Sequence, residues 1–368
     1  MTLHAVDDID EAIDATKSFL FPFELRQWLR MALVVFFIGG GGTGGLQNVG
    51  QFSNFGDGGT GGPSAGEFSL TAPLESLPAV PGPGRLFQVG APVPAEPSSL
   101  ANEVGAAVLV AAAAGILVLA LAFGYLGAVM EFAFAQSLIS QEIHVRRYLG
   151  RHKGNGLWLF AFRLVLGLLS LAVLLGVVAV VFVVAGGSFQ DPSASVLLGS
   201  LGLVIVALVG FAVVHGLING FTNTFVVPMM VQRGDGLVAG WKRLLGSLRA
   251  EPKQYLAYVF FSVVLGIGVS IVGSIAGLVA ALIVAIPFGI VGLVVGFGLA
   301  AVSQTAGIVG GVVVAVLYLL VLLVVANMIK APLQTFLRYY GMLVLGDIDE
   351  TLDPIPSVRA TLRSDQQA

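Results

Sequence analysis

QYLAYVFFSVVLGIGVSIVGSIAGLVAALIVAIPFGIVGLVVGFGLAAVSQTAGIVGGVVVAVLYLLVLLVVANMI, residues 254–329, contains no charged residue. About 20 apolar residues in a helix cross the hydrocarbon core of a bilayer, so this stretch is long enough for two or three spans. Lipid offers no hydrogen bonds, and the backbone groups therefore need partners within the chain. Long Val, Leu, Ala and Gly runs lack the alternation of a β-barrel, which leaves helices as the expected structure.

The composition of the whole chain agrees with this. Of the 368 residues, 57% are hydrophobic and 11% are charged, whereas soluble domains carry about 25% charged residues. The sequence predicts an all-α, polytopic transmembrane helical bundle of about six spans in three repeated pairs, with interfacial elbow helices on the cytoplasmic side. The six stretches of spanning length are 28–45, 104–130, 157–186, 195–222, 255–286 and 306–330.

The segment 287–305 interrupts the charge-free stretch. It contains Pro287 and four glycines, and it closes with Ser303, Gln304 and Thr305. We expect a re-entrant or interfacial piece here, between two spans. The alternative is a third span within 254–329, which gives seven spans and places the C-terminal tail outside.

The distribution of Lys and Arg predicts the orientation. In the six-span arrangement all of the 18 basic residues except Arg85 fall on one side of the membrane, and the positive-inside rule makes that side the cytoplasm. We therefore expect a multi-pass plasma-membrane protein with both termini in the cytoplasm. Residues 1–368 form a single integral membrane domain in this prediction, with an acidic amphipathic segment at 1–27, a Gly/Pro-rich, irregular extracellular loop at 46–103 and a cytoplasmic tail at 331–368.

Internal repeats support the three pairs. Alternate spans begin with an aromatic residue and leucine, and such aromatic residues anchor spans at the membrane interface: Trp28-Leu29, Trp158-Leu159 and Tyr255-Leu256. The segment 230–235 resembles 342–347, and 8–14 resembles 347–353. The elbow at 237–249 has leucines at helical spacing and basic residues on other faces, which predicts an amphipathic interfacial helix.

The residue types needed for catalysis are scarce or poorly spaced. The chain has no cysteine, which excludes disulfides, thiolate nucleophiles and cysteine metal sites. The glycines at 39–45 lack the Gly-Lys-Ser/Thr ending of a phosphate loop. The histidines show neither metalloprotease nor triad spacing: they are His4, His144, His152 and His215.

Two acidic features also lack the required pattern. The cluster from Asp7 to Asp14 has no EF-hand spacing, so a short amphipathic helix with solvated acids is expected. Gly234-Asp235 and Gly346-Asp347 lie beyond the spans, where turns are expected rather than the paired aspartates of an intramembrane protease. We therefore assign no catalytic, cofactor-binding or metal residue and expect no cofactor. The net charge of −3 gives no reason to expect nucleic acid as a partner.

A polar stripe lies in the fourth predicted span. His215, Asn219 and Asn223 recur every four residues and so share one helix face. Gly216 and Gly220 flank the stripe as a GxxxG pair. One interpretation is helix packing, with a glycine notch and hydrogen bonds between helices. The other is a polar path for a solute or a lipid headgroup.

An ion pair is expected near the inner face. Glu131 ends the second span and Arg163 enters the third, and together with Lys330 they are the ionisable residues nearest the membrane. A charge at mid-bilayer costs roughly 2.5–3.5 kcal/mol, so a partner of opposite charge is expected. We predict that Glu131 and Arg163 pair with each other.

Two segments resemble known sequences. They are the elbow Gly234-Asp235-Gly236-Leu237 with Trp241-Lys242-Arg243-Leu244-Leu245, and the opening Ile9-Asp10-Glu11-Ala12-Ile13-Asp14-Ala15-Thr16. They resemble uncharacterised multi-pass membrane proteins of haloarchaea. Residues 130–270 are distantly similar to the membrane domain of glycerophosphodiester phosphodiesterases. No soluble phosphodiesterase domain accompanies them, so the resemblance implies an archaeal plasma-membrane protein and adds no site residue.

Two classes of function follow from these features. The spans carry no charge deep inside, and coupled transporters commonly place charges there. This favours a non-enzymatic envelope or scaffold component whose partners are membrane lipids. The repeats, the broken segment at 287–305 and the polar stripe favour the alternative, a transporter, channel or lipid-handling protein. Protein partners and the oligomeric state do not follow from the sequence.

Overall fold

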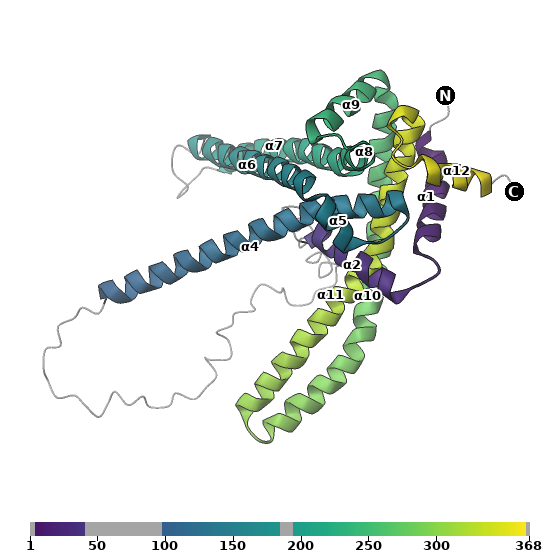
Figure 1. Cartoon of the computed structure of the whole chain (residues 1–368). Coiled ribbons are helices and arrows are strands. Elements are labelled where there is room, and N and C mark those ends of the chain that lie inside the picture. Colours follow the sequence, from purple (N-terminus) through teal and green to yellow (C-terminus); the bar gives the residue numbers. More distant parts are fainter. Residues whose placement is uncertain (1–3, 41–97, 185–193, 366–368) are drawn as a thin grey trace, which may run out of the picture. The chain divides into compact units, whose positions relative to one another are not determined.

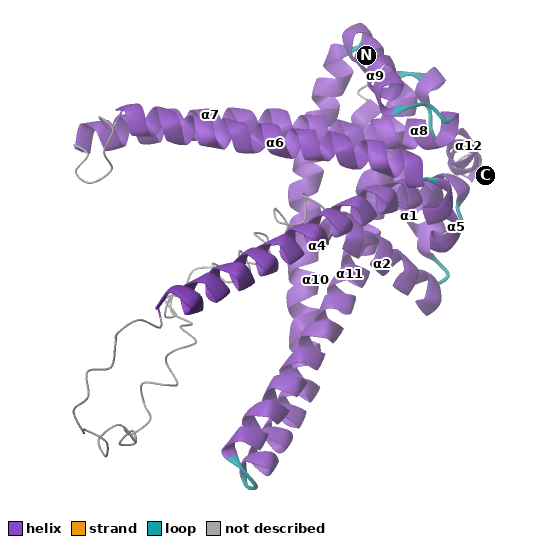
Figure 2. Ribbon diagram, turned by 60° about the vertical axis from the view of Figure 1, so that its left-hand side comes forward, coloured by secondary structure: helices purple, strands orange, loops and turns teal. Residues whose placement is uncertain are grey.

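The computed structural model describes residues 4–40, 98–184 and 194–365, and every regular element within those ranges is helical (Figures 1 and 2). This confirms the all-α prediction. In chain order the elements are α1 (His4–Leu20), α2 (Leu25–Gly40), α4 (Ser98–Ser140), α5 (Val145–Arg151), α6 (Lys153–Val184), α7 (Ala194–Phe221), the π-helical turn η2 (Thr222–Val226), α8 (Val227–Arg233), α9 (Leu237–Ala250), α10 (Pro252–Ala300), α11 (Gln304–Ile348), the 3₁₀ turn η3 (Glu350–Leu352) and α12 (Pro356–Asp365).

Five helical segments in this part of the chain are long and apolar enough to cross a membrane. They are Val108–Ser140, Lys153–Val183, Val204–Arg233, Pro252–Ala300 and Gln304–Ile348. Helix α2, in the first predicted span, has 16 residues and is shorter than these. The predicted span at 28–45 and most of the predicted loop at 46–103 continue into residues outside the described ranges, whereas residues 98–103 begin α4.

The prediction of a re-entrant piece at 287–305 is wrong. Helix α10 continues through Pro287 for 49 residues, and after a short turn α11 begins at Gln304. Residues 254–329 therefore form two helices, and the third span of the seven-span alternative is not present either. Proline and glycine are tolerated in membrane helices because neighbouring helices, Ser and Thr side chains and local adjustments of the helix give the freed backbone groups new partners.

The glycines near the turn allow close packing instead of ending the helix. A Cβ at Gly307 would lie 2.8 Å from the carbonyl oxygen of Gly296, and one at Gly310 would lie 2.6 Å from Leu299 Cδ1. Real Cβ atoms do not approach other atoms so closely; at Gly307 the obstacle is backbone, so only glycine fits there, whereas at Gly310 the Leu299 side chain would have to move. Helices α10 and α11 consequently pack side by side (Figures 1 and 2).

Buried side chains gather where the ends of several helices meet. We call this region the hub, and define it by the buried faces of α1 and α2 with residues 128–138 of α4, 225–230 of η2 and α8, and 339–345 of α11. All of these lie in one compact unit, which comprises α1, α2, the part of α4 from residue 120 onward and the helices that follow it, whereas the earlier part of α4 belongs to a second unit. Beyond the hub, α6, α7, α10 and α11 expose apolar side chains along much of their length.

The N-terminal helix buries two of its acids. Asp8 and Glu11 are 1% and 9% exposed, whereas Asp10 and Asp14 face outward. The face that packs on the hub carries Ala12, Ala15 and Phe19, and α1 contacts α11 and α12. The prediction that all acids of this segment are solvated is therefore wrong for two of them, because α1 is a packed element.

The sequence repeats do not have equivalent surroundings. Trp158 is 69% exposed, whereas Tyr255 is 1% exposed. Gly234 ends α8 with φ 75°, whereas Gly346 lies within the last turn of α11, so only the first is a turn residue. Residues 331–348, expected in the cytoplasmic tail, continue α11 into the hub. The helix predicted at 237–249 is present as α9.

Candidate functional site in the helical hub

The most deeply buried carboxylate in the hub is that of Glu131, on α4. It is 0% exposed. Arg163 Nη2, from α6, lies 3.1 Å from Glu131 Oε2, and Arg338 Nη2, from α11, contacts Glu131 Oε1. The structure thus brings together the two residues of the predicted ion pair and adds a second arginine. One carboxylate joins three helices.

Asn223 brings a fourth segment into this cluster. Its side-chain oxygen accepts a hydrogen bond from Arg163 at 2.9 Å, and its backbone carbonyl accepts one from Arg338 Nη1. The residue lies in the π-helical turn η2, and the local sequence explains why its carbonyl is available. The amide of Val227, four residues on, is bonded to the Thr222 carbonyl, and Pro228, five residues on, has no N–H to donate.

We call Glu131, Arg163, Asn223 and Arg338 the charge cluster. Its arginines are largely removed from water: the side chain of Arg163 is 13% exposed and that of Arg338 is 7% exposed. Arg338 also lies over the ring of Phe134, 5.4 Å from the centroid, which favours a cation. The cluster carries one negative and two positive formal charges. Because both oxygens of Glu131 contact arginines, the carboxylate is placed as a counter-ion and not as a proton acceptor.

The three residues of the polar stripe have different partners. His215 Nδ1 lies 3.1 Å from Ser170 Oγ of α6, and Asn223 belongs to the charge cluster. Asn219 donates to the His215 carbonyl of its own helix at 3.2 Å. A Cβ on Gly216 or Gly220 would meet nothing within 4 Å. The expected glycine notch is therefore not filled by another helix of the described chain, and the packing interpretation of the stripe stays a prediction.

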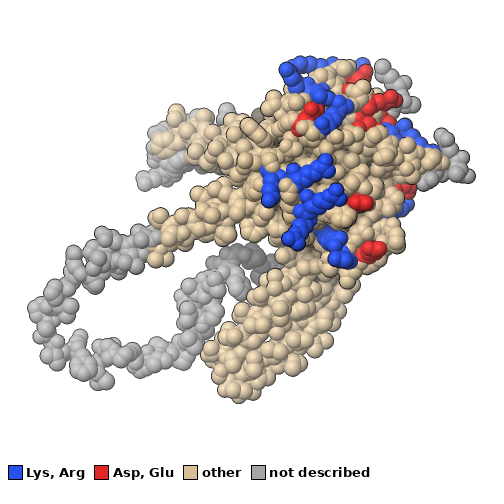
Figure 3. Space-filling view, in the orientation of Figure 1, with Lys and Arg blue, Asp and Glu red and all other residues tan. Residues whose placement is uncertain are grey.

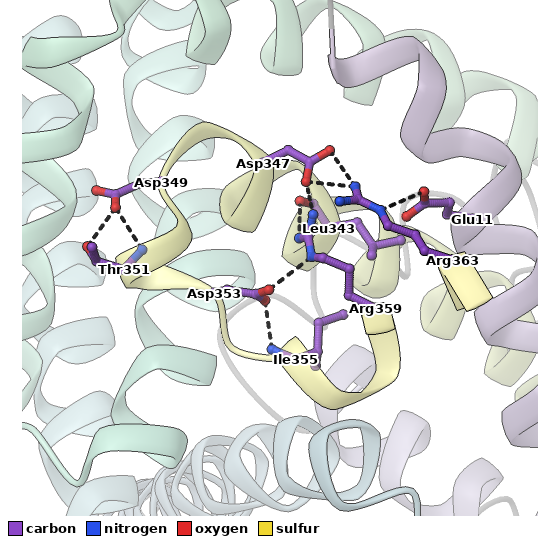
Figure 4. Close-up of polar contacts among 9 residues, drawn as sticks. All are labelled: Glu11, Leu343, Asp347, Asp349, Thr351, Asp353, Ile355, Arg359 and Arg363. Carbon is purple, nitrogen blue, oxygen red and sulfur yellow. Dashed lines mark hydrogen bonds and ion pairs between the residues drawn. The ribbon is translucent and has the colours of Figure 1, made fainter. Parts of the chain in front are cut away.

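A second polar cluster holds the C-terminal helix (Figure 4). Arg359 donates to Asp353 Oδ2 at 2.9 Å and to the Leu343 carbonyl at 2.6 Å, and also contacts Asp347. Arg363 bridges Asp347 at 2.9 Å and Glu11 at 3.2 Å. We call this group the C-terminal clasp, because it ties α12 to α11 and α1.

The clasp borders an open hollow of about 720 Å³, which Gln232 and Arg233 also line. Burial raises the pKa of Asp353, against the opposing effects of the Ile355 amide and Arg363. Burial lowers the pKa of Arg359, and Arg363 adds to this effect. The mutual neutralisation of these groups makes the clasp a structural contact between helices.

The structure also bears on the metal and protease interpretations of the sequence. Within the described ranges, no group of three or more His, Asp or Glu side chains is close enough to hold a metal ion. Asp235 pairs with Arg243 at 3.1 Å, whereas Asp347 belongs to the clasp, so the two aspartates of the repeated motif take part in separate ion pairs. The glycines at 41–45 lie outside the described residues.

Sequence reasoning missed Arg338, because it was assigned to the tail. The available signal was its spacing from the apolar stretch: Arg338 lies only eight positions beyond Lys330, with apolar residues among those between. The role of the Asn223 backbone was also missed. Pro228, inside an otherwise apolar span, was the signal that a carbonyl one turn earlier lacks its usual donor.

A comparison with protein families gives one match. A family of unknown function (DUF7544) matches residues 3–355, nearly the whole chain. No curated protein and no solved structure matches. The likeness to phosphodiesterase membrane domains therefore has no support from these comparisons.

Proposed function

This chain belongs to the DUF7544 family, whose function is unknown, and we propose that it is a non-enzymatic scaffold of the plasma membrane. In this proposal six spans are joined at the cytoplasmic face by the hub. The observation that carries it is the charge cluster, in which Glu131 joins α4, α6 and α11 through two arginines. Such a junction holds span ends in fixed positions.

The positions of the helix ends support six crossings. Helices α4 and α11 end at the hub, and α6 and α10 begin beside it. Helix α1 also packs on the hub. Helix α4 ends at the hub, so in this proposal it begins at the opposite face of the membrane, whereas α1 lies at the face of the hub. The chain therefore crosses the membrane once between α1 and α4. Helix α2 lies in that interval and supplies the sixth crossing, which gives the pairs α2/α4, α6/α7 and α10/α11.

The charges support a cytoplasmic hub. Lys and Arg side chains gather over the helix ends around α5 and α9, whereas the long apolar stretches carry none (Figure 3). This is the asymmetry that the positive-inside rule describes. It supports the proposal that both termini lie in the cytoplasm, since α1 and α12 contact each other.

A closed hub favours the scaffold over transport. The charge-cluster residues are bonded to one another, and the two described hollows are lined by other residues than His215 and Asn219. The alternative is a transporter, channel or lipid-handling protein. Its support is the line of polar groups between α6 and α7, from the His215–Ser170 contact to Asn223 and Arg163.

Single cysteines test both the topology and the choice between functions, because the natural chain has none. Cysteine at Ser64 is expected to react with an impermeant maleimide on intact cells, and cysteine at Ser364 only after permeabilisation. Reaction at Ser364 on intact cells would contradict six spans with cytoplasmic termini.

Cysteine at Asn219 separates the scaffold from the transporter. In reconstituted protein the scaffold predicts no reaction with a small water-soluble thiol reagent and no leak of encapsulated ions above that of empty liposomes. Cysteine at Val206, on the exposed apolar surface of the same helix, is the lipid-facing control. Reaction at position 219 but not at 206 would replace the scaffold with the polar path.

A further inference from the structure

A surface of positive charge lies where α2 meets the segment between α4 and α6. We call it the basic surface, and its residues are Arg26, Arg30, Arg146, Arg147, Arg151 and Lys153. Arg30 Nη1 donates to the Ile143 carbonyl at 3.4 Å, which brings α2 beside the start of α5. Figure 3 shows basic side chains in the region of α5. Two segments far apart in the sequence thus contribute cations to one region.

The described part of the chain supplies no acidic partner to this surface. Within the described residues none of the six cations makes an ion pair, and the neighbouring acid Glu142 lies 3.3 Å from His144. Three arginines on α9 and α12 are paired: Arg243 with Asp235, Arg359 with Asp353, and Arg363 with Glu11. Six cations gathered in one region without an acidic partner among the described residues suggest that the counter-charge of the basic surface comes from outside the chain.

The position of the surface identifies the source of that charge. Helix α5 lies between the end of one candidate span at Ser140 and the start of the next at Lys153. Phe21 and Phe23 are exposed just before α2 and contact the ring of Trp28, with centroids 6.2 and 5.0 Å away. Aromatic residues beside cations at a span end are typical of the headgroup region.

We propose that the basic surface binds the headgroups of anionic phospholipids in the leaflet that faces the hub. Guanidinium groups bind phosphate oxygens through paired hydrogen bonds, and Arg146, Arg147 and Arg151 are exposed for this on one short helix. The inference rests on the proposed membrane location of the protein. It goes beyond it by naming the lipid class and the residues that recognise it.

The experiment compares anionic with zwitterionic lipid on purified full-length protein. Phosphatidylglycerol and phosphatidylcholine with identical chains are titrated into the protein in neutral detergent, and binding is followed through the thermal unfolding midpoint. Only phosphatidylglycerol is expected to raise the midpoint strongly. The triple variant Arg146→Gln, Arg147→Gln and Arg151→Gln should weaken that response about 100-fold in lipid concentration, at about 1 kcal/mol or fivefold for each charge.

Matched variants decide whether the site is local. The triple Lys variant at the same three positions keeps the charge but loses the paired hydrogen bonds, so its response should lie between those of the natural protein and the Gln triple. The triple Arg233→Gln, Lys242→Gln and Arg249→Gln removes the same charge from exposed positions on α8 and α9 and should retain most of the response. If the two Gln triples lose the response to phosphatidylglycerol equally, the proposal is overturned, because the attraction between the chain and anionic lipid is then general and not local.

Two further outcomes are decisive. Inorganic phosphate at equal concentration should leave the midpoint unchanged, and a phosphate response lost in the Arg146, Arg147 and Arg151 variant would mean that the ligand is a soluble anion. In a variant in which Trp158 and Trp241 are replaced by Phe, bromine-labelled phosphatidylglycerol should quench the fluorescence of Trp28. If Trp28 is quenched but the triple Gln variant still responds to phosphatidylglycerol like the natural protein, the protein lies in the membrane without recognising the headgroup at this surface. Failure of this inference is therefore distinguishable from failure of the scaffold proposal.

Discussion

The substitution Glu131→Gln tests the physical basis of the hub. It keeps the size of the side chain and removes its charge, while Arg163 and Arg338 stay in place. Glutamine has one carbonyl oxygen to offer, and its amide group points donors at the other arginine. The variant therefore leaves two largely desolvated cations together without an anion. Breaking a buried ion pair in this way costs about 3–5 kcal/mol.

The neighbouring substitutions should follow an order set by exposure and charge balance. Arg338→Gln leaves Glu131 with Arg163, whose side chain is 13% exposed, and Arg163→Gln leaves it with Arg338, whose side chain is 7% exposed. Each single loss keeps one positive and one negative charge, so both should cost less than Glu131→Gln, about 1–3 kcal/mol. Of the two, Arg338→Gln should cost more, because Arg338 is the more buried and its acceptor is a fixed backbone carbonyl, whereas the Asn223 side-chain oxygen that Arg163 bonds can turn to another partner.

Equilibrium unfolding in mixed micelles, followed by helical circular dichroism, measures these differences. Glu131→Asp is the control that keeps the charge and shortens the reach by one methylene. Replacement of Glu131, Arg163 and Arg338 together by Leu and Met should recover most of the loss, since apolar residues of similar size often replace buried ions without cost. The reasoning fails if Glu131→Gln costs under about 1 kcal/mol, or if Arg163→Gln is the most damaging of the three.

Three other predictions follow from the packing and the charges. Gly341→Ala should destabilise the hub by about 1–3 kcal/mol because its Cβ would overlap Thr224 Cγ2, whereas Gly216→Ala, which meets nothing within 4 Å, should be neutral or stabilising in the same melt. Burial, with a smaller effect from Arg151, lowers the pKa of His152 below its ordinary 6.5. The unfolded chain then binds a proton more readily, so stability should fall as the pH drops below about 6.5, and His152→Phe should reduce that slope in melts from pH 7.5 to 5. Arg359→Gln should release α12, seen as faster trypsin cleavage at Arg363 with little change in the midpoint of hub unfolding, and a lower midpoint would instead make the clasp part of the hub.

The sequence predicted the helices well because their causes are local. A charge-free run such as 254–329 needs no knowledge of its neighbours to be recognised as membrane-crossing helix. Pro287 and the glycines near it were misinterpreted because their effect depends on the neighbour. Gly307 and Gly310 are explained only by the atoms of Gly296 and Leu299 that face them. A pattern in one segment does not reveal which atoms of another segment lie opposite.

The charge cluster was half predictable for a related reason. Glu131 and Arg163 stand out because each is a charge beside an apolar run, and a nearby opposite charge is the lowest-cost solution. Arg338 belongs to a stretch with ordinary spacing of basic residues, so only its burial and its contact with Phe134 distinguish it. The sequence did not show where the last span ends and the tail begins, because that boundary depends on how far α11 continues into the hub.

Pro228 links the local sequence to the tertiary site. Its missing N–H deprives a carbonyl one turn earlier of a donor, and the π-helical turn directs the Val227 amide to Thr222. An unpaired carbonyl at this depth would be costly, and an arginine from α11 meets it while also contacting Glu131. The proline thus creates the acceptor, and the acceptor helps to fix where α11 packs. The π-helical turn thus positions Arg338, the arginine that joins η2 to α4 in the hub.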